Sequence, residues 1–425
     1  MTVQMKESGV DWLGRVPAHW GVVRSRRLFR ERNEKANKSD LQLTVSQKYG
    51  LLPQAEFMEK EGRRIVVVQK GHDILKRTMP GDFVISMRSF QGGLEISEYE
   101  GSVSSAYVPL VPIKWVVPRY FRWVFKSITY IQALQSTSDL VRDGQALRFE
   151  NFSKIPLPAV PIEEQSAIAD FLDRSTARID ALVAKKTRFV ELLREKRQAL
   201  ITHAVTKGLD ATVPLKDSGV EWLGAVPAHW EIVPPTALFT ESKERAREGD
   251  RVLSATQKYG VIPLDEFEAL EQRQVTKASA NLEMRKHVEI GDFVISMRSM
   301  DGGLERSHAV GSVRSSYSVL KAGADVDGIF YGALLKSSLY IQALRLTSSF
   351  IRDGQDLNFS HVRKVKLPKL PLKEQAEIAE YIDAQSTRIA TLIAKTERSI
   401  ELLREHRTAL ITAAVTGKID LRDPA

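Results

Sequence analysis

The longest regular pattern in the chain is a run of apolar residues at alternating spacings of four and three. It starts at Pro161 and continues to about Thr206 without a glycine or another proline, and a matching run starts at Pro371. Such spacing is typical of the buried seam of a coiled coil. The predicted seam residues are Ile168, Leu172, Ile179, Leu182, Phe189, Leu193 and Leu200 in the first helix, and Ile378, Ile382, Ile389, Leu392, Leu403 and Leu410 in the second.

The segments that precede these helices, 1–158 and 208–368, mix short strand-like runs with glycine-containing turns. A shorter helix is expected over 120–134 and again over 330–344. The strand-like runs include Ile65–Val68, Phe83–Ser86 and Val294–Ser296, and the turns include Gly92-Gly93 and Gly302-Gly303. The pattern therefore predicts a mixed globular part before each long helix.

The two halves of the chain are copies of one another. SGVDWLGRVPAHW begins at Ser8 and SGVEWLGAVPAHW at Ser218, and GDFVISMRS recurs at Gly81 and Gly291. Both motifs recur at the same offset of 210 residues. Such an offset indicates a duplicated domain, because solenoid repeats have much shorter periods. We predict an α+β chain of four parts: domain 1–158, long helix 159–207, domain 208–368 and long helix 369–425.

The long helices could pair with each other or with those of a second chain in a homodimer. Connectivity favours the first arrangement, because each helix joins or follows a domain whose termini are expected to lie close together. The prediction is an intramolecular antiparallel coiled coil with pseudo-two-fold symmetry, a rod of roughly 60 Å. Duplex DNA has the same local dyad, so two such domains suit two half-sites on opposite strands.

Composition narrows the class of protein. The chain has no cysteine, which excludes disulfides, and no apolar segment that suggests a signal peptide or a membrane span, so we expect a cytoplasmic protein. Of the formal net charge of +9, most lies in residues 1–160, where 24 Lys and Arg face 16 Asp and Glu; residues 208–370 have 21 of each. A basic balance favours a polyanion partner, although a charged run is often only a solvated face.

No motif for catalysis stands out. The phosphate loop, the dinucleotide fingerprint, the H-E-x-x-H zinc motif and the N-P-P-[YF] tetrapeptide of adenine methyltransferases are all absent from the sequence. His19 and His229 repeat within PAHW, where a structural role is favoured over a metal site. Asp143 and Asp353 have no second acidic partner at a recognisable spacing for nuclease chemistry. We therefore expect a chain that is not itself an enzyme.

The repeated motifs resemble those of a known family. GV(D/E)WLG-x-VPAHW opens each half, LP-x-(V/L)-P-(I/L)-x-EQ-x-x-IA leads into each long helix, and ELLRE-x-R-x-ALIT-x-AVT lies near the end of each helix. Over the whole chain they resemble the specificity (S) subunit of Type I restriction-modification systems. By that resemblance, 1–158 and 208–368 are target recognition domains, and 159–207 and 369–425 are conserved spacers.

The resemblance also implies partners and cofactors. The subunit would bind a bipartite duplex target and join two adenine-N6 methyltransferase (M) subunits, to which ATP-dependent restriction (R) subunits can be added. It would hold no cofactor itself: S-adenosylmethionine would sit on the M subunit, and ATP and Mg on the R subunit. The repeated EQ pairs and the repeated tryptophans, Trp12 and Trp222, are assigned to packing and to methyltransferase docking.

Candidate DNA contacts come from side chains that can reach base edges or phosphates. The best segment precedes each Gly-Gly pair, and others are the QKYG, GSV and RDGQ motifs, where RDGQ could equally be a structural turn. The residues are Gln47, Lys48, Tyr49, Arg88, Ser89, Gln91, Ser104 and Arg142 in the first copy, and Gln257, Lys258, Tyr259, Arg298, Ser299, Asp301, Arg314 and Arg352 in the second.

Because GDFVISMRS is shared, we expect half-sites related as imperfect inverted repeats, with differences arising at Phe90-Gln91 against Met300-Asp301 and across 61–80 against 271–290. Two other functions remain. A stand-alone DNA-binding regulator or antirestriction protein would bind its site without a methyltransferase. A coiled-coil scaffold with peptide-binding domains would show no salt-dependent DNA binding.

Overall fold

The computed structural model describes residues 4–62, 64, 74–86, 89–113, 115–137, 148–275, 282–296, 298–347 and 357–421. The chain divides into two compact units, one of Met1–Thr187 with Arg398–Ala425 and one of Arg188–Glu397. Each unit thus holds one globular part together with half of each long helix. Among the described residues, no helix combines the length and the apolar character needed to cross a bilayer.

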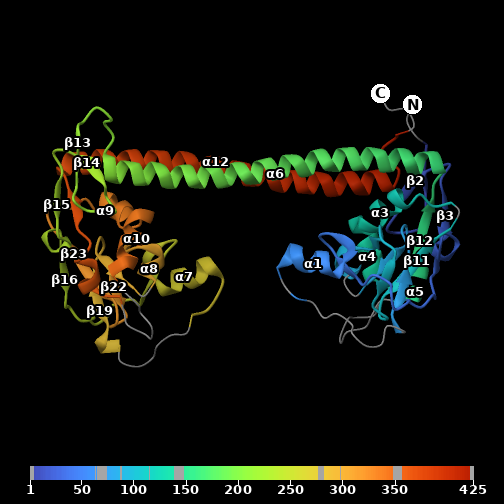
Figure 1. The fold of residues 1–425 in the computed structure, drawn as a ribbon, viewed down its shortest axis with the longest axis horizontal. Helices are drawn as coiled ribbons and strands as arrows, with labels where there is room; N and C mark the ends of the chain where they lie inside the picture. Colours follow the sequence, from blue (N-terminus) through green and yellow to red (C-terminus); the bar gives the residue numbers. More distant parts are fainter. Residues whose placement is uncertain are drawn as a thin grey trace. The chain divides into compact units, whose positions relative to one another are not determined.

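The first globular part begins with short strands and leads into the first long helix, which continues into the second unit (Figure 1). Its elements are β1 (Met5–Glu7), β2 (Arg15–Pro17), β3 (Gly21–Arg24), η1 (Ser25–Arg27), β4 (Phe29–Glu31), β5 (Leu43–Ser46), β6 (Gly50–Pro53), α1 (Gln54–Glu61), β7 (Lys76–Thr78), β8 (Phe83–Ile85), α2 (Ser89–Gly92), β9 (Glu95–Ile96), β10 (Gly101–Val103), β11 (Val108–Pro112), α3 (Pro118–Lys126), α4 (Ile128–Gln135), α5 (Phe149–Ser153), β12 (Pro156–Ala159) and α6 (Ile162–Lys207).

A four-stranded antiparallel sheet in the order β4-β11-β8-β9 forms the centre of this unit. Two-stranded pairs surround it: β1 with β2, β3 with β12, β5 with β6, and β7 with β10. The core beneath the sheet is rich in aromatic rings, and Phe29 packs edge-on against Phe83 and Phe121 at 5.6 and 5.2 Å between centroids. Burying such rings supplies much of the apolar stabilisation of a domain.

The second unit repeats this order at an offset of 210 residues. Its elements are β13 (Leu215–Asp217), β14 (Ala225–Pro227), β15 (Glu231–Val233), η3 (Pro235–Ala237), β16 (Phe239–Ser242), β17 (Leu253–Thr256), β18 (Gly260–Pro263), α7 (Leu264–Glu271), η4 (Leu282–Met284), β19 (Lys286–Val288), β20 (Phe293–Ile295), α8 (Ser299–Gly302), β21 (Glu305–Arg306), β22 (Gly311–Val313), β23 (Ser318–Ala322), α9 (Gly328–Leu334), α10 (Ser338–Thr347), α11 (Phe359–Val362), β24 (Leu367–Lys369) and α12 (Leu372–Val415).

The second sheet runs β16-β23-β20-β21, the counterpart of the first. Even the register is kept: Val108 pairs with Ile85, and Ser318 pairs with Ile295. The strands expected around Phe83 and Val294 are confirmed as β8 and β20. The run Ile65–Val68 lies outside the described residues.

The single helix expected over 120–134 is wrong, because two helices, α3 and α4, occupy that region. Ser127 separates them with an extended backbone, and its hydroxyl donates to Val124 O at 2.7 Å and accepts from Tyr130 N at 3.4 Å. This is N-cap behaviour, which starts a new helix. The second copy breaks in the same place, between α9 and α10.

The long helices pair with each other within each unit, as expected. In the first unit Ile168 and Leu172 near the start of α6 share a core with Val415 at the end of α12. Farther along α6, Asp180 receives Arg407 at 2.9 Å, so the two segments run antiparallel (Figure 1). The second unit does the same with Val205 and Ile378 at its core. Arg194 of α6 pairs there with Glu397 of α12 at 2.9 Å.

The seam differs from the prediction at three of the thirteen positions, Leu182, Phe189 and Leu392. Leu182 and Phe189 of α6 are each 46% exposed, whereas Val183 is half-buried and Val190 is buried. In α12, Leu392 is 40% exposed. Apolar residues are adjacent at these places, so two heptad frames fit the sequence and only contact with the partner helix selects one. The other predicted positions are buried or half-buried: Ile168, Leu172, Ile179, Leu193, Leu200, Ile378, Ile382, Ile389, Leu403 and Leu410.

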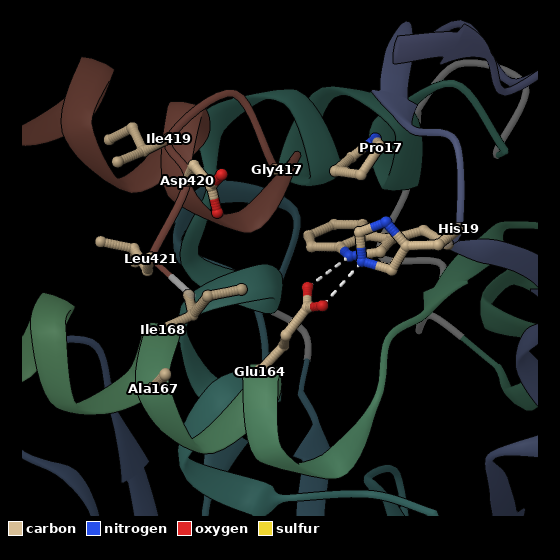
Figure 2. A pocket seen from close by; sticks show the side chains of 10 residues that line it. Pro17, His19, Glu164, Ala167, Ile168, Gly417, Ile419, Asp420 and Leu421 are labelled. Atoms are coloured by element: carbon tan, nitrogen blue, oxygen red, sulfur yellow. Dashed lines mark hydrogen bonds and ion pairs between the residues drawn. The ribbon is translucent and has the colours of Figure 1, made fainter. Parts of the chain in front are cut away.

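The EQ pair at the start of each long helix attaches the globular part to that helix. Figure 2 shows Glu164 facing His19, and its carboxylate accepts from Trp20 Nε1 at 2.8 Å and contacts His19 Nε2 at 2.7 Å. In the second unit Glu374 repeats both contacts, with His229 and Trp230. The repeated His-Trp therefore has the structural role expected from its lack of metal spacing.

The glutamine of the pair is buried, and its side-chain amide makes three hydrogen bonds. Gln165 accepts from Val117 N at 2.8 Å and donates to Trp115 O at 2.9 Å and Val160 O at 2.8 Å. Gln375 makes the equivalent three bonds. Buried amides without partners are costly, so three satisfied bonds fix the angle at which the strand passes into the helix.

Candidate nucleic-acid interface

The segment before each Gly-Gly pair folds into a single helical turn after the central strand β8 or β20. The predicted contacts Ser89 and Ser299 are buried there, and their hydroxyls accept from Ser86 N at 2.9 Å and Ser296 N at 3.0 Å. They hold the turn together, so the expectation that they are exposed to DNA is wrong. A serine that caps a turn and one that reads a base look alike in sequence.

The QKYG loop lies against this turn and unites two of the candidate segments. A Cβ placed on Gly92 would be 2.8 Å from Gln47 Nε2, and one on Gly302 would be 2.6 Å from Gln257 Cγ. A side chain at either glycine would displace this glutamine. In each unit the QKYG glutamine and the helical turn therefore form one surface, which we call the paired-loop surface: Gln47–Tyr49 with Ser89–Gly92, and Gln257–Tyr259 with Arg298–Gly302.

The lysine and tyrosine of QKYG form a small cluster with a carboxylate. Lys48 lies 4.6 Å from the centre of the Tyr49 ring and 3.2 Å from Glu61, and hydrogen bonds to Tyr49 and then Glu61 raise the pKa of this lysine. In the second unit Lys258 lies 4.7 Å from the Tyr259 ring. Both lysines are about 70% exposed, at 70% and 71%. Each lysine remains charged and accessible, so a DNA phosphate could replace the carboxylate as its ion-pair partner.

Exposed side chains on the paired-loop surface differ between the copies. Gln91 is exposed, and in its place Asp301 is exposed and pairs with Arg345 at 2.8 Å. Gln135, the counterpart of Arg345, donates to Phe90 O at 2.6 Å. Two neutral amides in one unit thus stand where an ion pair forms in the other, and the two surfaces present different hydrogen-bonding groups.

The turn between β10 and β11 provides the third candidate position. Ser104 is exposed there, as is Arg314 in the equivalent turn of the second unit. Arg314 lies near Arg285, whose pKa is lowered by burial and then by the charge of Arg314. Arg285 donates to Ser312 O at 2.6 Å. Sequence reasoning missed this second arginine because its position, after a variable stretch, belongs to no repeated motif.

A buried ion pair beneath the paired-loop surface was also missed. Glu305 is 3% exposed and pairs with Lys336 at 2.7 Å, while the same ammonium donates to Gln257 O at 2.8 Å. Glu95 and Lys126 form the equivalent pair. Burial raises the pKa of both carboxyls, and the lysines oppose that shift. The sequence feature that could have indicated this ion pair is the glutamate that follows Gly-Gly-Leu in both copies.

Arg88, Arg142 and Arg352 lie outside the described residues, and Arg298 is exposed at the start of its turn. Of the remaining predicted contacts, those with exposed side chains are Gln47, Lys48, Gln91, Ser104, Gln257, Lys258, Asp301 and Arg314, and those half-buried are Tyr49 and Tyr259. Within the described ranges no group of three or more His, Cys, Asp or Glu side chains is placed to hold a metal ion.

Two relatives among known proteins are named as specificity subunits of type I restriction enzymes. The putative type I restriction enzyme MjaX specificity subunit of Methanocaldococcus jannaschii is 23% identical over 290 residues, which are 63% of this chain and 60% of that protein. The type I restriction enzyme StySPI specificity subunit of Salmonella potsdam is 26% identical over 153 residues, 35% of this chain and 33% of that protein. The chain therefore matches less than two thirds of either curated relative. No protein-family model matches it.

The fold agrees over nearly the whole chain. The crystal structure of the HsdS subunit from Thermoanaerobacter tengcongensis superposes with a TM-score of 0.59 at 14% identity, covering 95% of this chain and 98% of that one. At this identity the likeness shows a shared fold, in which tandem mixed domains alternate with long helices. In sequence the chain is thus similar to specificity subunits of type I restriction enzymes, and it shares the fold of a solved HsdS subunit.

Proposed function

We propose that the chain is the DNA sequence-specificity subunit of a type I restriction-modification complex. The globular parts 1–158 and 208–368 would be its target recognition domains, each reading one half of a bipartite duplex target. The segments 159–207 and 369–425 would set a non-specific spacer between the half-sites and carry the partner subunits. This function extends to the chain what its curated relatives are named for.

The observation that carries the proposal is the paired-loop surface, present once in each unit on the same scaffold. It exposes amides, lysines and an arginine beside aromatic rings, and its base, the Gly-Gly turn, is fixed by buried serine hydroxyls. Direct reading of bases requires such hydrogen-bonding side chains on a rigid support. Exposed residues that vary between two copies of one support are what different half-sites would need.

The catalytic chemistry would belong to the partners. Since specificity subunits contribute recognition, S-adenosylmethionine would be bound by the methyltransferase subunits, and ATP with Mg by the restriction subunits. The long helices offer apolar side chains that the chain itself leaves exposed: Leu182 and Leu402 in the first unit, and Phe189, Leu192 and Leu392 in the second. Exposed leucine and phenylalanine on an otherwise polar helix favour a protein partner, and we assign them to methyltransferase docking.

The test is co-expression with a candidate type I methyltransferase gene from the same genome, followed by genome-wide mapping of N6-methyladenine. We expect a single bipartite motif with two short half-sites related as imperfect inverted repeats and a spacer of constant length. Methylation in two unrelated half-sites would contradict the predicted relation between them. A chain that copurifies with no methyltransferase, yet binds one DNA site tightly, would instead be a stand-alone DNA-binding protein.

Arg298 provides a sharper test at the level of one residue. It is exposed, and no hydrogen bond or ion pair of its side chain occurs in the described part of the chain. If Arg298 binds a guanine in bidentate fashion, R298A should cost about 1–3 kcal/mol on the cognate half-site and relax its sequence preference. If it binds a phosphate, the loss should be equal on unrelated DNA, with a weaker salt dependence. Competition binding with cognate and scrambled duplexes separates the two outcomes.

A further inference from the structure

An arginine-only surface lies on the first unit, between the end of β3 and the middle of β4. In the stretch 24–30, four residues are exposed, and all four are arginine: Arg24, Arg26, Arg27 and Arg30. The other three residues of the stretch, a serine, a leucine and a phenylalanine, are buried in the core. We call the four exposed residues the arginine ridge.

The second unit shows that the fold does not require these arginines. The equivalent stretch 234–240 has the same alternation of exposed and buried positions, with strand, single helical turn and strand in the same order. Its four exposed residues are Pro234, Thr236, Ala237 and Thr240, none of which is charged. The charge of the ridge is therefore an addition to a shared scaffold.

No residue that the structure describes neutralises the ridge. None of its four side chains has a hydrogen bond or ion pair among the residues that the structure describes, whereas nearby Arg32 is held by Asp82 at 2.6 Å. Four like charges crowded into seven residues repel one another unless an anion lies between them. Within the described ranges the four arginines of the ridge therefore have no anionic partner.

The chemistry of the ridge fits phosphates better than a protein surface. Guanidinium groups bind phosphate oxygens in a planar, two-pronged geometry that lysine cannot reproduce. Protein interfaces, in contrast, need an apolar or aromatic centre, and the exposed positions of this stretch include no such residue. A series of phosphates at regular spacing, as along a nucleic-acid backbone, would neutralise all four arginines.

The ridge also lies apart from the paired-loop surface. Arg30 is on β4, one edge of the four-stranded sheet, whereas Leu51 beside the QKYG loop bridges to Ser97 next to β9, the opposite edge. Three strand spacings separate these edges, about 14 Å, which is close to half a turn of duplex DNA. A duplex read by the paired loops could therefore meet the ridge with its backbone beyond the bases that are read.

We propose that the arginine ridge is a sequence-independent binding site for the phosphate backbone of duplex DNA, present only in the first unit. The proposal rests on the DNA-binding function above and deepens it. It makes the two domains unequal, because only the first adds the four charges of the ridge to the contacts that both domains share.

The test replaces the ridge with the residues of the second copy. The full-length variant R26T/R27A/R30T should keep the fold, since those residues already occupy the equivalent exposed positions. Its affinity for a random-sequence duplex is measured by fluorescence anisotropy over a range of NaCl concentrations. The log–log salt slope should fall by up to about 2.7, so that a fourfold rise in salt costs the wild type about 40-fold more affinity than the variant.

A charge-matched control removes three exposed cations from α6 in the same unit: R174T/R178A/K185T. Its slope should stay close to that of the wild type, because no ridge contact is lost. The reciprocal variant T236R/A237R/T240R builds a ridge on the second unit and should steepen the slope. It keeps the test valid even if the first variant folds poorly.

Three results would overturn the proposal. One is a ridge variant with an unchanged slope while the wild type binds DNA; this leaves the proposed function intact. Another is an equal loss in the control, which would show a general effect of net charge. The third is a ridge variant that binds DNA normally and loses only its methyltransferase partner. If the wild type shows no salt-dependent DNA binding at all, the proposed function fails together with the inference.

Discussion

At the scale of single residues, the duplication provides its own controls, because one buried position can have different partners in the two copies. Asp82 is 2% exposed and is held by Arg32 at 2.6 Å, a contact that raises the pKa of the arginine. Asp292 occupies the equivalent position, but Ser242 replaces the arginine, and burial raises the pKa of this carboxyl. The charge of Asp82 is balanced by Arg32. Asp292 has no such arginine, so ionising its buried carboxyl costs free energy.

We therefore expect the same substitution to act in opposite directions. D82N should destabilise the first unit by about 3 kcal/mol, because it leaves Arg32 without its buried counter-charge. D292N should leave stability unchanged or increase it at neutral pH, because Asn still accepts from Glu289 N, which lies 2.9 Å from Asp292. Urea unfolding of the two variants measures both effects. Equal destabilisation by both would contradict this account.

His287 should make the stability of the second unit depend on pH. The ring is 1% exposed and contacts Asp250 and Glu289, each at 2.9 Å. Burial lowers the pKa of the ring, but the bonds to the two carboxylates outweigh burial and also the charge of Arg247, so the pKa is raised above its ordinary value. The stabilisation is then complete below about pH 6.5 and is lost as pH rises through the folded-state pKa.

The first copy provides the matched control for this residue, since Arg77 stands where His287 does and pairs with Glu100. H287R should remove the loss of stability above about pH 6.5, because arginine stays charged. Thermal unfolding of wild type and variant at a series of pH values shows the difference. A wild-type profile identical to that of H287R would show that the histidine does not titrate in this range.

At the scale of elements, the long helices were predictable and their exact packing was not. More than forty residues without glycine or proline, in which apolar residues are spaced by four and three, predict a helix. Leu182 and Val183 are adjacent, however, and both are apolar, so either could face inward. The same ambiguity hides the break at Ser127, where a serine inside an apolar run is as good a helix residue as it is a cap.

Val190 and Phe189 test which frame is buried. V190A removes a side chain that is 5% exposed and should destabilise the second unit by about 2 kcal/mol. F189A removes one that is 46% exposed and should change stability by less than about 0.5 kcal/mol. If the outer face docks the methyltransferase, F189A should instead weaken copurification with it. Chemical unfolding measures the stability of each variant, and affinity pull-down measures methyltransferase binding. If F189A is less stable than V190A, the heptad frame predicted from the sequence is the buried one.

At the scale of the whole molecule, one scaffold occurs twice, and the proposed recognition of two half-sites would depend on where the copies differ. The tandem order, the mixed fold and the shared motifs were all accessible from the sequence because the repeat has no net insertion. The roles of individual loop residues were not, since Ser89 and Gln91 are near neighbours with opposite exposure. Only three-dimensional contact separates the residues that support the paired-loop surface from those that it presents.

The differing pair on that surface predicts how specificity could be moved from one domain to the other. Q91D/Q135R places in the first unit the ion pair that Asp301 and Arg345 form at 2.8 Å in the second. Because the supporting turn and its buried serine are shared, the new pair should adopt the same geometry. We expect the half-site read by the first domain to become more like that read by the second, while the second half-site stays unchanged. Mapping of N6-methyladenine in cells that carry the variant measures this directly.

The reciprocal variant D301Q/R345Q should shift the other half-site toward the first. If both variants methylate the wild-type motif, these side chains support the surface without reading DNA, and the asymmetry of the half-sites must arise elsewhere in the two domains.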